Sequence, residues 1–413
     1  MGSMLDRIHN KTTPDIIRAI VRRILKVYPS FIISHIVSCC IILFLYLIDR
    51  FYHIRVGLII TQRIGHLALN METFARKKNS GWHQGNRHIL IAGKPCNVQL
   101  LKMWKRNHNI IESNFLYELF WHSLWLWKKT KLFEPLEMFS NEYQIFQDEY
   151  PTLEFTNEEE EIGKKYLKKM GINQSKNWFV CIFARDTEYL KNIYPGAQWD
   201  YHNFRNSDID KFIPAIKYII DKGGYVVRVG HHVNKPVNFA HSKFIDYSLN
   251  FRNDFMDIYL MAKCRFVLGT TSGICDVAMI FDRPRVGVNW VPIGSAPWGK
   301  QCLYIPKKLR GKNSKKYIFF TQFIHKTKNK ANPLLWYGNL FYEAGYEYEN
   351  NTPEEILDAT KEMVARLEGT WHPSEENQKL LKKYYQAFPV DHWSVEVKTP
   401  IGLDFMKKYK HLF

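Results

Sequence analysis

The sequence predicts an α/β protein with two Rossmann-like halves that follow a hydrophobic N-terminal segment. Short apolar runs alternate with helical patterns between residues 54 and 290, which is typical of mostly parallel sheets. The alternation is interrupted at Gly171–Asn177 and then begins again with an apolar run, which indicates two sheets joined by a hinge. A length of 413 residues is sufficient for two such domains and an appendage.

In the first half, we expect strands at Ile54–Ile60 and His88–Ala92. The helical patterns between and after them are at Ala68–Lys77, Val98–Trp104, Asn114–Trp127 and Asn157–Met170. The last of these helices begins with acidic residues and ends with lysines, an order that complements the helix dipole.

In the second half, the apolar runs that predict strands are Trp178–Phe183, Tyr225–Val229, Phe244–Asp246, Arg265–Leu268 and Arg285–Val288. Helices are expected at Asp210–Asp221 (with Ser207 as N-cap), Asp254–Ala262, Ile274–Phe281, Pro353–Arg366 and Glu375–Ala387. The predicted domains are 1–52 (membrane-associating helices), 53–172 (first Rossmann-like half), 173–372 (second Rossmann-like half) and 373–413 (a C-terminal helical end returning to the first half).

The N-terminal segment has the composition of a membrane-binding element. Pro14–Tyr28 combines a helical apolar spacing with four basic residues, which suits an anionic membrane surface. Phe31–Ile48 contains no Asp, Glu, Lys or Arg, and its 18 residues are just enough for a span of about 17–25 residues. The segment could span the membrane, lie in it, or be a buried helix of the fold. We expect a peripheral or single-span protein at the cytoplasmic face of the inner membrane.

The overall charge predicts an anionic partner. The formal net charge is +18 and the isoelectric point is about 9.4, which suits phospholipid, nucleic acid or a phosphorylated substrate. No basic-aromatic recognition motif for nucleic acid is evident. The seven cysteines include no CxxC pair and are best explained as reduced thiols.

The loop Gly269–Gly273 (Gly-Thr-Thr-Ser-Gly) connects an expected strand to an expected helix and is suited to hold phosphate. A plain strand–helix turn with a Ser or Thr cap is the alternative. Because the carboxyl ends of parallel strands meet at one edge, other polar residues should join it there. The predicted donor-binding residues are Arg185, Arg205, Asn206, Ser207, Arg228, Gly230, Thr270, Thr271, Ser272, Gly273 and Asp276. Asp276 could accept from a sugar hydroxyl or simply complement the dipole of its helix.

In the first half, His66 follows the first strand and is the predicted general base, because a histidine can accept a proton near neutral pH. Glu72 and Asp186 are rival bases, and Gly65 and Asn70 are predicted on the acceptor side.

Asp208 and Asp210 have a spacing that can hold a divalent metal, but helix capping explains the pair better. We therefore expect no protein-bound metal and no obligatory cofactor.

Four segments resemble bacterial glycosyltransferases of the GT-B architecture, in particular a family found in surface-polysaccharide loci such as those for capsule and lipopolysaccharide. They are Gly65–Asn70, Phe204–Ile209, Val227–Gly230 and Gly269–Gly273. A fainter similarity to fucosyltransferase-type enzymes includes Ala184–Thr187. The resemblance implies two domains facing across a cleft, with the donor bound by the second and the acceptor by the first.

The sequence thus predicts a transferase that moves a sugar from a nucleotide-sugar donor to a lipid-linked or growing surface glycan. We expect it to be inverting and metal-independent. The alternatives are a non-catalytic GT-B scaffold of a polysaccharide assembly complex and a basic nucleic-acid-binding protein.

Overall fold

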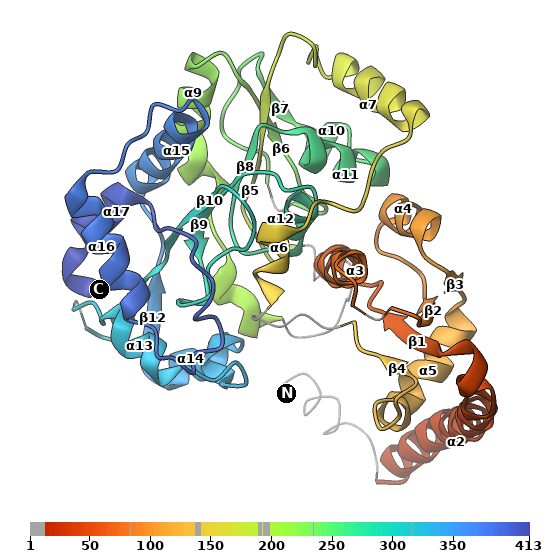
Figure 1. Ribbon diagram of the computed structural model, residues 1–413. Coiled ribbons are helices and arrows are strands. Elements are labelled where there is room, and N and C mark those ends of the chain that lie inside the picture. The colour runs from red at the N-terminus through yellow and green to blue at the C-terminus, as the bar shows by residue number, and fades with distance from the viewer. Residues whose placement is uncertain are drawn as a thin grey trace. The chain divides into compact units, whose positions relative to one another are not determined.

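The computed structural model describes residues 13–82, 84–136, 142–188, 192, 199–233, 235–314 and 316–413, with the backbone alone over 13–30. The chain forms two compact units (Figure 1). Unit 1 comprises Met1–Gln62, Gly81–Cys96 and Trp104–Glu137, and unit 2 comprises Arg63–Ser80, Asn97–Met103 and Met138–Phe413. The chain therefore passes between the units several times.

Unit 1 contains a parallel sheet in the order β3-β2-β1-β4. Its strands are β1 (Ile54–Ile59), β2 (Arg87–Ala92), β3 (Ile110–Glu112) and β4 (Phe133–Glu134). Helices α2 (Thr13–Tyr52) and α5 (Asn114–Trp127) pack against each other in the same unit. The predicted basic helix and the apolar segment that follows it form one continuous helix, α2.

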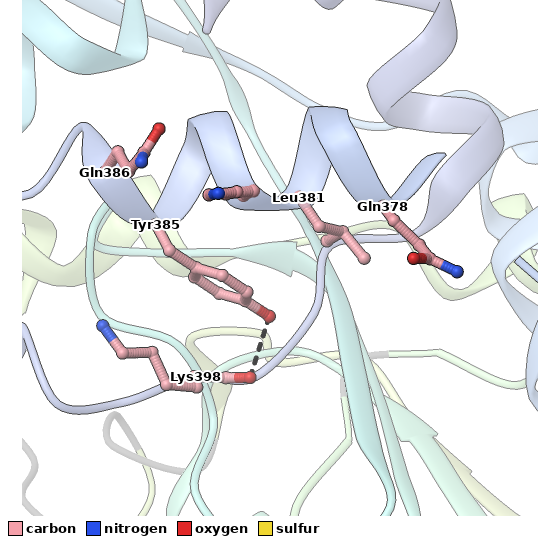
Figure 2. Close-up of a pocket in the computed structure, with 6 residues that line it drawn as sticks. Gln378, Leu381, Tyr385, Gln386 and Lys398 are labelled. Atoms are coloured by element: carbon pink, nitrogen blue, oxygen red, sulfur yellow. Dashed lines mark hydrogen bonds between the residues drawn. The ribbon is translucent and has the colours of Figure 1, made fainter. Parts of the chain in front are cut away.

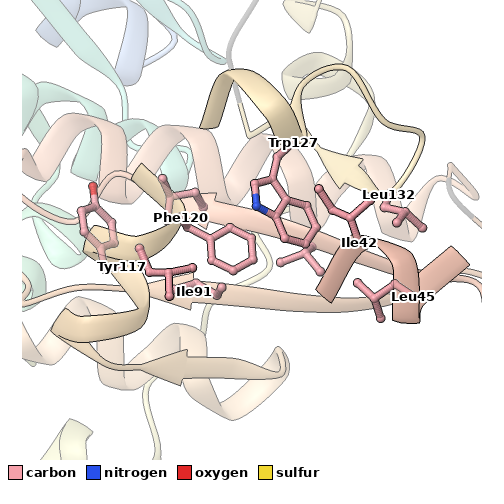
Figure 3. Packing of buried hydrophobic residues seen from close by; sticks show 10 residues of the cluster. Ile42, Leu45, Ile91, Tyr117, Phe120, Trp127 and Leu132 are labelled. Atoms are coloured by element: carbon pink, nitrogen blue, oxygen red, sulfur yellow. The ribbon is translucent and has the colours of Figure 1, made fainter. Parts of the chain in front are cut away.

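The hydrophobic core of unit 1 joins these two helices to the sheet (Figure 3). Helix α2 contributes Ile42 and Leu45, and α5 contributes the stacked rings of Phe120 and Trp127, whose centroids are 4.3 Å apart. Strands β1 and β2 complete the cluster. Helix α2 is therefore attached to the domain through part of its surface.

Unit 2 contains a parallel sheet in the order β10-β9-β8-β5-β6-β7. Helices α9 and α15 lie on one side of it, and α11 and α12 lie on the other (Figure 1). Both faces of a parallel sheet are covered in this way, so its strands are continuously apolar rather than alternating. The strands are β5 (Phe179–Phe183), β6 (Tyr225–Arg228), β7 (Phe244–Asp246), β8 (Phe266–Gly269), β9 (Arg285–Trp290) and β10 (Cys302–Pro306).

The longer helices of unit 2 are α3 (Ile64–Asn79), α7 (Asn157–Lys169), α9 (Ile213–Asp221), α11 (Asp254–Lys263), α12 (Gly273–Ile280), α15 (Pro353–Leu367) and α16 (Glu375–Gln386). Shorter ones are α6 (Ile145–Asp148), α10 (Tyr247–Asn250), α13 (Phe320–Lys326), α14 (Gly338–Glu343) and α17 (Leu403–Lys408). Helix α4 (Val98–Asn107) begins in unit 2 and ends in unit 1. A separate antiparallel pair consists of β11 (Lys308–Gly311) and β12 (Tyr346–Glu349).

The prediction of two parallel α/β sheets is confirmed, because strand periodicity and helix caps are local signals. The capping box of α7, for example, joins Thr156 and Glu159. The helix predicted at Asp210–Asp221 with Ser207 as its cap is wrong in detail. A 3-10 turn at Ile209–Phe212 precedes α9, and the side chain of Asp208 caps that turn. The predicted domain boundaries and the return of the last helix to the first half stay predictions.

Candidate active site

The carboxyl edge of the six-stranded sheet brings together loops from distant parts of the chain. Arg185 follows β5, Thr270 follows β8 and Lys307 follows β10. The backbone N–H of Arg185 donates to Oγ1 of Thr270 at 3.0 Å, which joins the loops after the two neighbouring strands β5 and β8. Ligands of parallel sheets bind at this edge, as the sequence predicted.

Three cations at this edge, Arg185, Arg205 and Lys307, form what we call the basic cluster. Nη1 of Arg185 donates to the carbonyl of His202 at 3.1 Å and to Oδ1 of Asn206 at 2.6 Å. Nζ of Lys307 donates to the carbonyl of Asn206 at 2.8 Å. These partners are neutral, so the bonds orient the cations without compensating their charge. Burial dominates the environment of Arg185, and the nearby charge of Asp186 opposes it only in part.

The basic cluster contains no ion pair with a carboxylate of the described residues. Within that part of the chain, Nε of Arg205 is buried without a hydrogen-bond partner. Cations so enclosed are costly unless an anion accompanies them. The geometry is therefore suited to an anion.

The same enclosure shifts the proton affinities of the cluster. Burial lowers the pKa of Arg185 to about 10, and burial together with Arg185 and Arg63 lowers that of Arg205 to about 10. Burial and the charge of Arg185 lower the pKa of Lys307 to about 7. The pKa of His202 falls to about 3, through burial and then the charges of Arg205, Arg185 and Arg63. His202 is therefore neutral at any physiological pH.

Asn206 and Ser207 hold the basic cluster in place. The N–H of Ser207 donates to the carbonyl of Arg185 at 3.0 Å, and its hydroxyl accepts from Nδ2 of Asn289 at 2.8 Å. Asn289 is in turn bonded to Asn351 in both directions through backbone N–H and side-chain oxygen. Both predicted residues lie at the site, where their contacts support the cations.

The two threonines of the loop Thr270–Gly273, which the sequence suggested as phosphate ligands, hydrogen-bond to neighbouring loops instead. The hydroxyl of Thr270 accepts from Arg185, and that of Thr271 both donates to the carbonyl and accepts from the N–H of Val291. These hydroxyls hold three loops together, which leaves them less able to bind phosphate. Ser272 is the N-cap of α12, and its side chain makes no capping bond.

Two glycines allow the first turns of α3 and α12 to touch. A Cβ added to Gly65 would lie 2.6 Å from Oδ2 of Asp276 and 2.8 Å from Cα of Gly273. A Cβ added to Gly273 would lie 2.8 Å from the backbone N of Gly65. The close approach places the Asp276 carboxylate against the start of α3. Burial raises its pKa to about 7, and the buried Arg285 partly opposes that rise.

His66 stands in this first turn of α3, beside Gly65. Burial, and then the charge of Arg63, lowers its pKa below the ordinary 6.5, while a hydrogen bond with Asn70 has the opposite effect. The imidazole is therefore neutral at pH 7 and able to accept a proton. Arg63 acts on His66, His202 and Arg205, so the predicted base and the basic cluster lie within electrostatic range of one guanidinium.

Glu72 is corrected from a candidate base to a packing residue. Its carboxylate is fully buried and accepts from Nε of Arg76 at 2.7 Å and from the N–H and hydroxyl of Thr152 at 3.0 and 2.7 Å. Nη2 of Arg76 continues to Asp282 at 3.0 Å. Both oxygens of the Glu72 carboxylate thus accept hydrogen bonds from the protein, and neither is open to solvent. The other rival, Asp186, is partly buried and accepts from the N–H of Glu188 at 3.0 Å.

Arg228 also has partners that its sequence position did not reveal. Its Nη1 donates to Asp246 at 3.0 Å and to the carbonyl of Lys235 at 2.7 Å. This buried ion pair joins β6 to β7 and shapes the loop that begins at Gly230, whose φ of +153° suits glycine. The charge that we predicted for the donor is already compensated.

The Asp208-Ile-Asp210 spacing is occupied by a lysine. Nζ of Lys235 lies 3.0 Å from Asp208 and 2.5 Å from Asp210, and Asp208 also accepts from the N–H of Asp210. Among the described residues, no cluster of three or more His, Cys, Asp or Glu is placed to hold a metal ion.

Sequence reasoning missed Lys307, Arg63 and His202. Lys307 follows β10, and an apolar run ending in Pro-Lys-Lys could have indicated a strand whose carboxyl end carries a cation. A separate surface pocket is lined by α16 and the chain near Lys398, where the hydroxyl of Tyr385 donates to the Lys398 carbonyl at 2.9 Å (Figure 2). None of the site residues lines that pocket.

Comparisons with known proteins were made for sequence and structure. No protein-family model and no curated protein matches the sequence. Among solved structures, the chain is similar to a glycosyltransferase family 9 protein from Veillonella parvula, at 11% identity and a TM-score of 0.44, covering 76% of this chain and 98% of that one. It is similar to ADP-heptose lipopolysaccharide heptosyltransferase II of E. coli, at 13% identity and a TM-score of 0.44, covering 76% and 99%. It is also similar to the iron-containing heptosyltransferase TibC in complex with ADP-D-β-D-heptose, at 9% identity and a TM-score of 0.37, covering 76% and 77%. At identities of 9–13%, the function has to be argued from the residues of this chain.

Proposed function

We propose that the protein is a glycosyltransferase that moves a sugar from a nucleotide-diphosphate donor to a lipid-linked or growing surface glycan. The observation that carries this proposal is the basic cluster of Arg185, Arg205 and Lys307. These three enclosed cations have no carboxylate partner among the described residues and lie at the ligand-binding edge of a parallel sheet. A diphosphate would supply the missing negative charge.

The chemistry follows from that charge. As the bond between the anomeric carbon and the diphosphate oxygen breaks, negative charge grows on the departing diphosphate. Cations fixed in a site of low dielectric stabilise it without reorganisation, and such stabilisation is usually the largest contribution to catalysis. The basic cluster would therefore lower the barrier to departure, with Asn206 and Ser207 keeping its side chains in position.

His66 is the proposed general base. It would take the proton from the acceptor hydroxyl as that oxygen attacks the anomeric carbon, and the nucleoside diphosphate would leave. Its lowered pKa keeps it neutral at pH 7, and Asn70 orients its ring. A single direct displacement inverts the anomeric configuration. Asp276, at the touching helix ends, is placed to accept a hydrogen bond from a sugar hydroxyl.

The proposed reaction is metal-independent. Lys235 pairs with both carboxylates of Asp208-Ile-Asp210, and the basic cluster offers the positive charge that a divalent ion would bring to a diphosphate. We place the reaction at the cytoplasmic face of the inner membrane, in surface-polysaccharide synthesis. The resemblance of the four sequence segments and the apolar segment Phe31–Tyr52 support that setting.

Nucleotide binding tests the proposal first. Thermal shift or calorimetry with UDP, GDP, CDP, ADP and CMP, with and without Mg²⁺, should identify one diphosphate that stabilises the protein. Arg205→Gln should abolish the effect. Arg265→Gln is the matched control, because Arg265 lies before β8 at the opposite edge of the same sheet and pairs with Glu368.

Turnover tests the base. With the matching nucleotide sugar and a membrane extract as acceptor source, His66→Ala should retain nucleotide binding and lose sugar transfer. Binding without transfer or donor hydrolysis by the native protein would favour the non-catalytic scaffold. An absence of any nucleotide effect, together with tight and salt-sensitive binding of DNA, would favour the nucleic-acid alternative.

A further inference from the structure

Two helices of unit 1, α2 and α5, expose large apolar side chains. The most apolar 18-residue window of the segment Phe31–Tyr52 of α2 has a mean hydropathy of 2.6, yet only 22% of that window is buried. The segment is long enough to cross a membrane. A buried core helix of the same composition would instead be mostly enclosed, so most of this segment is available to a partner.

One narrow stripe of the segment attaches it to the domain. The stripe has helical spacing and consists of Ser34, Ser38, Ile42, Leu45 and Asp49. Polar contacts fix it to α5, because the hydroxyls of Ser38 and Ser123 are 2.7 Å apart and Nε1 of Trp127 donates to Ser38 at 3.1 Å. Nε1 of Trp125 also contacts the ring of His35 at 2.6 Å.

The rest of the segment presents apolar side chains to the outside. Leu47 is 77% exposed and Phe44 60% exposed, although both are large and apolar. The exposed apolar side chains of α2 and α5 include ten that we call the two-helix face: Ile32, Ile33, Ile36, Leu43, Phe44, Leu47, Phe51, Phe115, Trp121 and Trp125. No Asp, Glu, Lys or Arg occurs from residue 31 to residue 48. Patches of this kind mark protein or membrane contacts.

The attachment stripe argues against a span. It extends from Ser34 to Asp49, which at about 1.5 Å per residue is roughly 22 Å of a hydrocarbon core of about 30 Å. If α2 crossed the membrane, the domain along that stripe would enter the hydrocarbon. The domain carries the ion pairs of Asp49 with Arg55 and with Lys131, at 2.6 Å each. Burying such groups in lipid is expensive.

If α2 lies in the plane of the membrane, each side of this helix has a suitable environment. The stripe remains on the domain, and the two-helix face enters the lipid. Tryptophans favour the membrane–water boundary, and Nζ of Lys129 lies 4.7 Å from the ring of the exposed Trp125. Arg50 lies in the last turn of α2, just after the uncharged stretch 31–48, and its cation suits anionic headgroups.

We infer that α2 and α5 together dock the protein on an anionic membrane surface, with α2 lying in the plane of the bilayer rather than crossing it. This surface lies entirely in unit 1. The inference therefore does not depend on the sugar transfer proposed for unit 2, and either can fail without the other.

Depth measurements along α2 test the orientation. The full-length protein, with the accessible Cys39, Cys40 and Cys96 replaced by Ser, would receive one new cysteine at residue 33, 36, 44, 47 or 51 and carry a fluorophore there. The vesicles would contain phosphatidylethanolamine and phosphatidylglycerol with quenchers at shallow or deep positions. An in-plane helix gives one shallow depth, about 5–10 Å below the headgroups, at every position. A depth that increases to the middle of the segment and then decreases would overturn the inference. A probe at exposed Lys217 on α9 should remain unquenched.

Binding measurements test the occupant. Phe44→Glu and Leu47→Glu place charges on the two-helix face without disturbing the stripe, and each should weaken vesicle binding at least about tenfold. Val390→Glu is the control, because Val390 is a 93% exposed apolar residue elsewhere in the chain. Native protein that ignores these vesicles, or that forms dimers lost in the same two variants, would contradict the membrane and indicate a protein partner.

Discussion

Two adjacent buried lysines give the sharpest test of the anion site. Lys307 and Lys308 follow β10 and are 3% and 2% exposed. Lys308 lies 2.7 Å from Glu349 and 3.7 Å from Glu355, and its pKa is raised because hydrogen bonding and these charges outweigh burial. Among the described residues Lys307 has no carboxylate partner, and burial lowers its pKa from 10.5 to about 7. The same substitution should therefore have opposite effects at the two positions.

For Lys307→Met we expect a more stable protein. One pKa unit corresponds to about 1.4 kcal/mol, so holding Lys307 in the native state costs about 4 kcal/mol at pH 7 relative to the unfolded chain. The substitution leaves the carbonyl of Asn206 without its donor, which costs about 1–3 kcal/mol. The net stabilisation is then about 1–3 kcal/mol. Lys308→Met should instead destabilise by about 1–3 kcal/mol, because Glu349 and Glu355 lose the buried cation that they share and retain only Arg310 and Lys408 as described cationic partners.

The direction in which the stability changes with pH follows from the native and unfolded pKa values of Lys307. Between the native pKa of about 7 and the unfolded value of 10.5, the unfolded chain binds more protons at Lys307, so the native protein becomes more stable as pH rises. The advantage of Lys307→Met should therefore decrease from pH 7 to pH 9, with the cost it removes falling from about 4 to about 2 kcal/mol. Thermal and urea unfolding of the native protein and both variants would measure this.

Lys307→Met should also bind a nucleoside diphosphate more weakly than the native protein does. Nucleoside diphosphate should stabilise the native protein and have little effect on Lys307→Met. A Lys307→Met protein that is destabilised like Lys308→Met would refute the reasoning, and so would a stability difference that does not change with pH. Either result would mean that Lys307 is a structural residue and that its charge is compensated.

Three further predictions concern binding and packing. A bound anion favours the charged form of Lys307, so calorimetry in buffers of different ionisation enthalpy should show proton uptake and an affinity that falls as pH rises above about 7. Gly65→Ala should destabilise unit 2 by about 2 kcal/mol or more, because the new Cβ meets the backbone and a carboxylate of α12. Gly311→Ala, where the nearest atom is 3.4 Å away, should be tolerated in the same unfolding assay. Glu72→Gln should cost about 1–3 kcal/mol of stability, because Arg76 loses the fully buried carboxylate beside it and retains Asp282 at 3.0 Å. Its folded fraction should transfer sugar normally, and loss of transfer at full stability would restore Glu72 as a base.

Much of the fold was readable from the chain. Strands such as Phe179–Phe183 and Phe244–Asp246, and the helix Asn114–Trp127, follow from periodicity, caps and glycines, which act over a few residues. The rule that parallel strands present their carboxyl ends at one edge then placed Arg185 beside the loop after β8. These expectations needed no knowledge of long-range partners.

Only the tertiary structure decided which charges are free. Arg228 and Arg185 look alike in sequence, yet Arg228 pairs with Asp246 from the next strand, while the guanidinium of Arg185 donates to the neutral His202 carbonyl and Asn206 side chain. The sequence offers both Glu72 and His66 as candidate bases, and only the folded structure shows that Arg76 and Thr152 enclose the Glu72 carboxylate. The reason is physical. Periodicity and capping are local free energies recorded in neighbouring residues, whereas the state of a charge depends on the burial and the partners that folding brings from tens or hundreds of residues away.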